Sequence, residues 1–113
     1  MDLDLEESGA VSILVLRGQL VGTSANSFRE AMDTLIESGR LRILLDFTDL
    51  SFMDSGGIGE LVSGYRTMDR LGGALKILKP GKRIQDTLTL TKLLPIFEVF
   101  EDRDVAIGSF SED

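Results

Sequence analysis

The chain has 113 residues and a formal net charge of −7, with 42% hydrophobic and 27% charged residues, and it contains neither cysteine nor histidine. This length suits one domain whose core needs no disulfide or metal. The missing cysteine and histidine exclude disulfides, Cys/His zinc sites, cysteine nucleophiles and the Ser-His-Asp triad. We therefore expect no catalytic residue, no metal and no cofactor. The negative charge argues against a nucleic-acid partner, which needs a basic face.

The ends and the hydropathy of the chain predict a cytoplasmic protein. No run of 18 or more apolar residues is present, so we expect no membrane span. The first seven residues are acidic, whereas a signal peptide begins with a basic segment followed by an apolar one. No repeat or linker divides the sequence, and we expect a single domain over residues 1–113. The last residues, 109–113, are expected to be a frayed tail.

The chain opens with a predicted hairpin and a helix. A weak alternating strand at residues 3–7 is followed by a turn at 8–9 and an aliphatic strand at 11–17. Ser24 is the predicted N-cap of the next helix, and Gly39 is its predicted stop. Apolar residues at helical spacing mark the buried face of this helix: Phe28, Ala31, Met32, Leu35 and Ile36.

Strands and helices then alternate. We expect a buried central strand, an amphipathic helix, a strand, a helix, a short edge strand and a final helix, over residues 42–47, 58–68, 74–78, 82–90, 97–100 and 102–108. Strands that alternate with helices indicate parallel strands joined by right-handed crossovers, while the first hairpin makes the sheet mixed. The predicted fold class is therefore α/β, with a mixed, largely parallel sheet of four to five strands and amphipathic helices packed on it.

The segment at residues 50–59, between the central strand and the second long helix, is the most informative for function. Asp54 and Ser55 are both good N-cap residues. Three glycines follow within four positions (Gly56, Gly57 and Gly59), and each costs a helix roughly 1 kcal/mol relative to alanine. A partner or a phosphate that approaches the backbone closely would explain them. Close packing of the helix on a strand is an equally open explanation.

Ser55 is the candidate functional side chain of this segment. A phosphate on its hydroxyl would meet free N–H groups and the positive end of the helix dipole, and it would add about −1.5 to −2 charges. A partner packed over the same surface would be repelled, which describes a binding switch. The alternative is that Ser55 serves only as an N-cap. A phosphate-binding loop is excluded because no lysine follows the glycines, and a nucleophile elbow is excluded because position 53 is Met.

The sequence Phe-Met-Asp-Ser-Gly-Gly-Ile-Gly at residues 52–59 resembles the switch motif of the STAS domain, found in anti-sigma factor antagonists. Further segments resemble the same family along almost the whole chain: residues 16–20, 43–47, 50–52, 72–77, 90–93 and 97–100. Two positions depart from the usual pattern. Gly56 replaces a frequent Ser or Thr, which leaves Ser55 as the only hydroxyl of the turn. Val21 and Gly22 stand where the family often has Asp.

This resemblance implies a STAS-type fold and a non-enzymatic role. The unphosphorylated form would bind an anti-sigma factor that is a serine kinase, and would so release a sigma factor. The kinase would phosphorylate Ser55, a PP2C-type phosphatase would remove the phosphate, and the modification would switch binding off. The residues that would contact the partner are Val21, Gly22, Asp54, Ser55, Gly56, Gly57, Ile58 and Gly59.

Two other functions stay open from the sequence. The first is a non-switching STAS module that acts as an accessory subunit of a transporter or in a stress-signalling scaffold. The second is an enzyme or nucleotide-binding protein with Asp54 as phospho-acceptor, which would need neighbouring acids and a lysine that the sequence does not place there. No second apolar face remains after the predicted stripes are buried, so we expect a monomer or a weak dimer.

Overall fold

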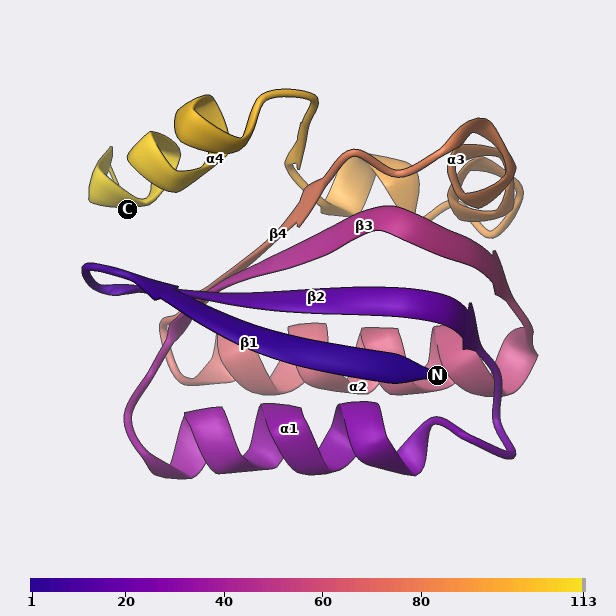
Figure 1. Ribbon diagram of the computed structural model, residues 1–113, viewed down its shortest axis with the longest axis horizontal. Helices are drawn as coiled ribbons and strands as arrows, with labels where there is room; N and C mark the ends of the chain where they lie inside the picture. Colours follow the sequence, from indigo (N-terminus) through magenta and orange to yellow (C-terminus); the bar gives the residue numbers. More distant parts are fainter. Residues whose placement is uncertain (113) are drawn as a thin grey trace.

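The computed structural model describes residues 1–112 as one sheet surrounded by helices (Figure 1). The elements follow in the order β1 (Asp2–Ser8), β2 (Val11–Leu20), α1 (Asn26–Glu37), β3 (Arg42–Met53), α2 (Ser55–Arg70), β4 (Ala74–Leu78), α3 (Lys82–Leu90), the 3-10 helix η1 (Leu94–Ile96), β5 (Val99–Phe100), α4 (Arg103–Ser109) and the 3-10 helix η2 (Phe110–Glu112). Within these residues, no helix is long and apolar enough to cross a membrane.

The sheet is mixed and largely parallel, as the alternation of strands and helices predicts. Its strands are ordered β1-β2-β3-β4-β5. Strand β1 pairs antiparallel with β2, and every later pair is parallel. The carboxyl ends of β2, β3 and β4 therefore lie on the same edge of the sheet, where α/β proteins commonly place their functional sites.

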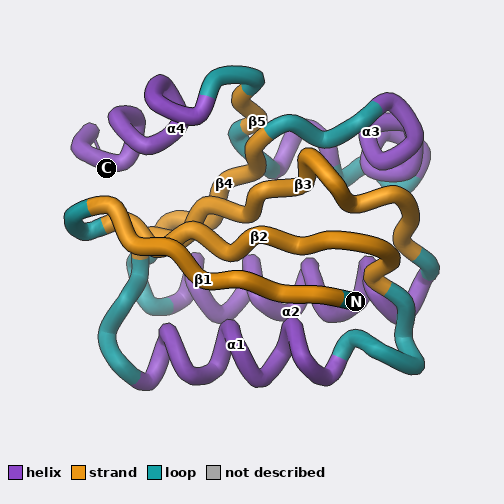
Figure 2. Tube along the Cα trace, in the orientation of Figure 1, coloured by secondary structure: helices purple, strands orange, loops and turns teal. Residues whose placement is uncertain are grey.

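The main core lies between the sheet and the two long helices. Helices α1 and α2 lie side by side on one face, while α4 lies on the other face (Figures 1 and 2). The predicted stripes supply buried side chains to this core: Phe28, Met32 and Leu35 from α1, and Leu61 and Met68 from α2. They meet alternate residues of β3, namely Ile43, Leu45 and Phe47. Both helices are thus fixed by burial of one apolar face.

Two strands are longer than the apolar pattern predicts. The runs end near residues 17 and 47, yet β2 continues to Leu20 and β3 to Met53. Thr48 and Asp49 interrupt the apolar run because both are exposed, but the backbone pairing of β3 with β2 continues as far as Leu20 and Met53. This extension carries both strands to the start of α2.

The entry to α1 differs from the prediction. The helix begins at Asn26, its N-cap is Ala25, and no side chain caps it. Ser24, the predicted N-cap, lies instead in a turn in which its N–H donates to the carbonyl of Val21 at 2.9 Å. The prediction of Ser24 as the cap is therefore wrong, because this turn moves the cap and the helix start one residue later, to Ala25 and Asn26.

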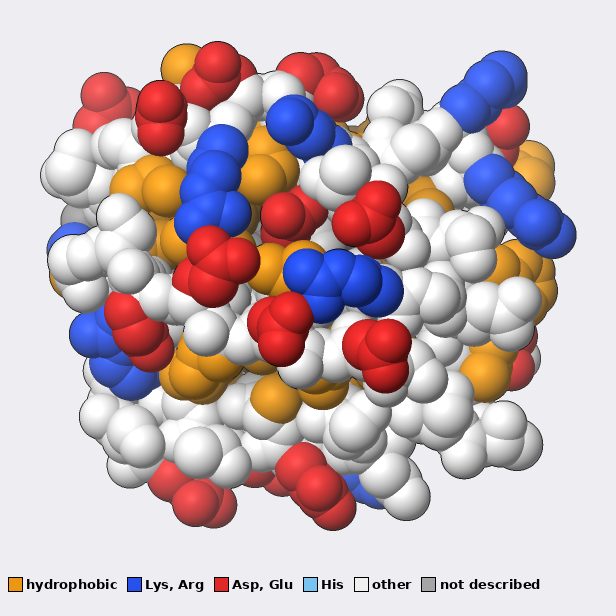
Figure 3. Space-filling model, viewed as in Figure 1, with side chains coloured by type: hydrophobic (Ala, Val, Ile, Leu, Met, Phe, Trp, Pro, Cys, Tyr) orange, Lys and Arg blue, Asp and Glu red, His pale blue; other side chains and the backbone are white. Residues whose placement is uncertain are grey.

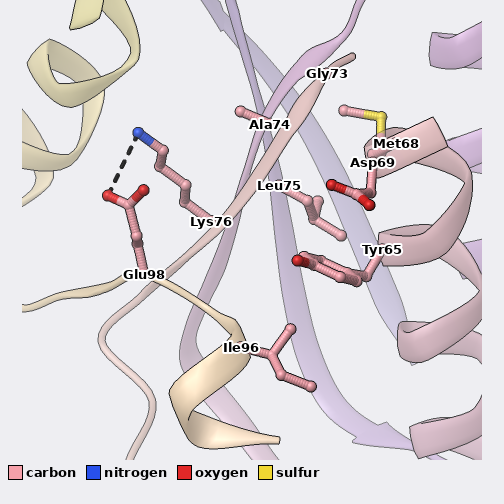
Figure 4. Close-up of a pocket in the computed structure, with 9 residues that line it drawn as sticks. All are labelled: Tyr65, Met68, Asp69, Gly73, Ala74, Leu75, Lys76, Ile96 and Glu98. Atoms are coloured by element: carbon pink, nitrogen blue, oxygen red, sulfur yellow. Dashed lines mark ion pairs between the residues drawn. The ribbon is translucent and has the colours of Figure 1, made fainter. Parts of the chain in front are cut away.

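The end of the chain is packed rather than frayed. Ser109 ends α4, and Phe110 is completely buried. Lys76 Nζ lies 3.0 Å from Ser109 Oγ, 4.5 Å from the centre of the Phe110 ring, and 3.6 Å from Glu98 Oε2 (Figure 4). The expected tail is thus wrong for residues 109–112, whereas residue 113 lies outside the described residues.

Replacement of the Phe110 side chain by alanine tests this packing. We expect Phe110→Ala to lower the free energy of unfolding by about 3–5 kcal/mol, because it opens a cavity between α4 and the sheet. Urea denaturation followed by circular dichroism measures the change. Val105→Ala, at a side chain of the same helix that is 60% exposed, is the control and should change stability by less than about 0.5 kcal/mol. Equal effects of the two substitutions would contradict the packed C-terminus.

Candidate functional site

Asp54 connects the start of α2 to the loop after β2. It is the N-cap of α2 and has an extended backbone, and its Oδ1 accepts the N–H of Gly57 at 2.8 Å. The same oxygen accepts the N–H of Gly22 at 2.9 Å. The Asp54 N–H in turn donates to the carbonyl of Leu20 at 3.3 Å. One side chain therefore holds together two segments that are 32 residues apart in the sequence.

Two of the glycines are explained by close packing within the protein. A Cβ added at Gly56 would lie 2.6 Å from Gly22 Cα, and a Cβ at Gly57 would lie 1.8 Å from the carbonyl oxygen of Leu20. Any side chain at either position would force the helix away from the end of β2. Gly59 is different, since a Cβ there would meet no atom within 4 Å. Internal packing therefore accounts for Gly56 and Gly57, and it leaves Gly59 unexplained.

Ser55 is free of any structural task. It is the first residue of α2, its side chain is exposed, and its hydroxyl makes no hydrogen bond within residues 1–112. The interpretation of Ser55 as an N-cap is therefore wrong, because Asp54 caps the helix. In the same described part of the chain, the N–H groups of Ser55 and Gly56 donate to no protein acceptor. An exposed hydroxyl thus lies beside two available donors at a helix start.

All eight sequence-predicted partner residues lie at this one edge of the sheet. Val21 and Gly22 follow β2, and the other six form the junction of β3 with α2. Ile58 is half-buried and packs against the main core, whereas Gly22, Ser55 and Gly59 are exposed. The exposed members leave a patch of backbone and small side chains that another protein can approach closely.

One neighbour of this edge does not follow from the motif. The guanidinium carbon of Arg83, in the first turn of α3, lies 4.9 Å from the centre of the Phe52 ring near the end of β3. This contact places α3 next to the segment that carries Ser55. The sequence feature that could have indicated this neighbour is the high density of basic residues from 79 to 92 in an otherwise acidic chain. The motif at residues 52–59 does not include it.

A surface pocket of about 220 Å³ lies away from this edge (Figure 4). Its lining comes from the end of α2, the beginning of β4, and the segment around η1, including Tyr65, Asp69 and Ile96. It therefore belongs to the amino-terminal end of β4, opposite the carboxyl ends at which Ser55 lies. Within the described residues, no group of three or more acidic side chains is placed to hold a metal ion.

Comparison with known proteins identifies a family and several relatives. The family model described as the STAS domain matches residues 2–106. An anti-sigma F factor antagonist of Paenibacillus polymyxa is 28% identical over 102 residues, which cover 87% of each chain. An anti-sigma-B factor antagonist of Bacillus subtilis is 33% identical over 85 residues, covering 74% of this chain and 76% of the relative.

Solved structures share the fold at lower identity. An anti-sigma factor antagonist of Mycobacterium paratuberculosis has a TM-score of 0.86 at 18% identity, covering 97% and 93% of the two chains. The Bacillus cell fate determinant SpoIIAA in its phosphorylated form has 0.77 at 24%, covering 96% and 98%. A sulfate transporter family protein of Wolinella succinogenes has 0.80 at 18%, covering 93% and 88%. These structural likenesses establish the fold alone.

Substitution of the glycines tests the packing at the start of α2. We expect Gly57→Ala to lower the free energy of unfolding by about 1–3 kcal/mol, because the new methyl group collides with the Leu20 carbonyl. Gly59→Ala should instead raise it by about 0.5–1 kcal/mol, because the site is open and alanine favours the helix. Urea denaturation of both variants decides the matter. The same sign for both would contradict the geometry.

Replacement of Asp54 tests its double hydrogen bond. Asp54→Ala should cost about 1–2 kcal/mol of unfolding free energy, because the helix loses its cap and the Gly22 N–H loses its acceptor. Asp54→Asn keeps an Oδ1 acceptor and should cost less than half as much. The check is the urea midpoint of each variant, with amide exchange at Gly22 as a local probe. Unchanged exchange at Gly22 in Asp54→Ala would rule out the bridge.

Proposed function

The chain belongs to the STAS domain family and, within it, to the anti-sigma factor antagonists, and we propose that it switches partners through phosphorylation of Ser55. Antagonists of this family are non-enzymatic regulators. In the proposed cycle, the unphosphorylated protein binds an anti-sigma factor with serine kinase activity, and so frees a sigma factor. The kinase phosphorylates Ser55 and releases the antagonist, and a PP2C-type phosphatase restores it. The proposed location is the cytoplasm, with the protein as a monomer or weak dimer.

The observation that carries this proposal is the state of the Ser55 hydroxyl. It is exposed and unbonded at the first position of α2, while Asp54 carries out the capping. A kinase can therefore reach the hydroxyl without breaking a contact of the fold. In support, the fold-related protein SpoIIAA has been solved in a phosphorylated form.

The phosphate would be tolerated by the fold and rejected by the partner. The helix dipole of α2 and the N–H groups of Ser55 and Gly56 favour an anion at this position. The same group adds about −1.5 to −2 charges and several heavy atoms to a patch whose exposed members, Gly22, Ser55 and Gly59, carry no charge of their own. A partner that packs on Gly22, Ser55 and Gly59 would meet both the charge and the bulk, so binding would weaken while the fold stays intact.

The two departures from the family motif limit the possible phosphorylation site and affect how the loop after β2 would contact a partner. Because Gly56 has no hydroxyl, Ser55 is the only phospho-acceptor that the turn offers. Gly56 is also held against Gly22, so the loop that lacks the frequent Asp of the family is fixed directly to the helix start. We infer that this loop contacts the partner through its backbone at Gly22 rather than through a carboxylate.

Substitution of Ser55 tests the switch. The baits are wild type, Ser55→Ala and Ser55→Asp, and the proteins that each retains from a lysate of the host are quantified by mass spectrometry. Wild type and Ser55→Ala should retain an anti-sigma factor with a kinase fold. Ser55→Asp should retain at least roughly tenfold less of this anti-sigma factor, as expected for a charge placed in a packed interface. With ATP, the captured kinase should phosphorylate wild type and leave Ser55→Ala unmodified.

Ser63→Asp is the matched control, because it adds the same charge to an exposed serine of the same helix. It should retain the anti-sigma factor as wild type does. If all four baits retain the same proteins, Ser55 is no switch. If those proteins are transporter or scaffold components instead of a kinase, the chain is the non-switching STAS module.

A further inference from the structure

Four exposed cationic side chains lie in α3 and in the segments just before and after it. They are Lys79, Lys82, Arg83 and Lys92, hereafter the α3 basic strip. Residues 79–92 contain one acidic residue, Asp86, and so carry a net charge of +3. Because the whole chain has −7, the remaining residues sum to −10. Blue side chains lie at the upper right of Figure 3, over the position of α3 in Figure 1, and others lie across the middle and at the left of the same face.

Most of this charge is not neutralised within the protein. Lys82 forms an ion pair with Asp86 at 3.1 Å, but both side chains are largely exposed, so the pair is weak. In the part of the chain that the structure describes, Lys79, Arg83 and Lys92 have no carboxylate partner. Three arginines elsewhere in the chain behave otherwise: Arg17 in β2, Arg40 before β3 and Arg103 in α4 each pair with a carboxylate of β1.

Two of the four lysines and arginines occupy backbone positions that favour glycine. The residue that follows the C-cap is Gly39 in α1 and Gly72 in α2. These glycines have φ of 74° and 75°, and the N–H of each glycine and that of the next residue donate to carbonyls of the last turn. Helix α3 ends with the same pair of hydrogen bonds, yet Lys92 takes the left-handed position with φ of 61°. Lys79, just after β4, has φ of 49°. The chain thus keeps two strained lysines where glycine would be more stable, which is a pattern found at functional positions.

The first part of the strip, residues 79–83, lies at the same edge of the sheet as Ser55. Residues 79–82 follow the carboxyl end of β4, and Ser55 follows that of the neighbouring parallel strand β3. The stacking of Arg83 on Phe52 joins α3 to the end of β3, just before Ser55. At the end of α3, Leu90 is 83% exposed, which adds an apolar side chain to a charged surface. Cations around an exposed leucine are suited to a protein surface with carboxylates.

We propose that the α3 basic strip docks onto an acidic surface of the anti-sigma factor while that protein contacts Ser55. The inference rests on the proposed function and adds a second contact region with its own chemistry. The strip steers and orients the encounter, because its positive field faces a partner of opposite sign while the rest of the chain is acidic. Nucleic acid and anionic membranes are disfavoured as occupants because these extended polyanions would reach beyond the strip onto the remainder of the chain, which carries −10, whereas a local patch of carboxylates would not.

Neutralising variants test the docking. Lys79→Gly/Lys92→Gly and Lys82→Gln/Arg83→Gln each remove two positive charges from the strip. Arg66→Gln/Arg70→Gln removes the same charge from exposed positions in the second half of α2 and is the matched control. Association and dissociation rates with the anti-sigma factor that wild type retains are measured by biolayer interferometry in 50 and 500 mM NaCl. Melting temperatures verify folding, and Lys79→Gly/Lys92→Gly should melt no lower than wild type.

Both strip variants should associate roughly five- to tenfold more slowly than wild type at low salt, and the difference should largely disappear at high salt. The control should change the rate by less than about twofold. Equal association of wild type and both strip variants overturns the inference and leaves the Ser55 switch standing. Retention of no anti-sigma factor by wild type or Ser55→Ala overturns both proposals. Binding of duplex DNA or phosphatidylserine vesicles by wild type alone, with unchanged binding of the anti-sigma factor by all variants, assigns the strip to that ligand.

Discussion

The double hydrogen bond of the Asp54 carboxylate holds together the edge of the sheet that carries the candidate site. A single oxygen accepts one N–H from the first turn of α2 and another from the loop after β2. Hydrogen bonds to a charged acceptor are stronger than hydrogen bonds between neutral groups. Gly56 and Gly57 then allow the two backbones to meet at distances that exclude a side chain. The position of the start of α2 is therefore set by contacts with β2 and the loop after it, as well as by the preceding strand β3.

This arrangement separates the residue that caps the helix from the residue that would be phosphorylated in the proposed function. Asp54 has the capping role, so the adjacent Ser55 needs no contact with the fold. In the reverse order, with serine as the cap, its oxygen would accept a helix N–H, and modification would disturb the first turn. The order Asp-Ser lets a phosphate change the surface while the helix start keeps its geometry. A switch that acts at an interface requires this independence, because the modified protein must stay folded to be dephosphorylated and used again.

The sequence predicts the elements that burial controls and fails where local contacts decide. The bounds of β4 and α3 agree with their apolar patterns, because both elements pack one face on the core. The end of β3 was missed because Thr48 and Asp49 are exposed while their backbone still pairs with β2. The packed C-terminus was missed because a single aromatic, Phe110, fixes it, and one residue has no periodicity to detect.

The candidate site shows the same division. Its residue types follow from the motif, and their common location follows from the parallel order of the strands. The separate roles of the three glycines do not, since only the fold reveals which Cβ would collide with Leu20 and which would point into open space. The bond between Asp54 and Gly22 also joins segments 32 residues apart, so no local pattern contains it.

A phosphate on Ser55 would also act on the α3 basic strip, and both of its effects would weaken binding of an acidic partner. A phosphate of about −1.5 to −2 charges on Ser55 is equivalent to about half to two-thirds of the +3 carried by residues 79–92. Screening over about 8–10 Å at physiological salt limits this effect to neighbouring groups, and the stacking of Arg83 on Phe52 makes α3 such a neighbour. Phosphorylation would then both block the contact at Ser55 and weaken the attraction that brings an acidic partner to it. One covalent change would thereby lower the association rate and raise the dissociation rate together, which makes a small protein domain an effective switch.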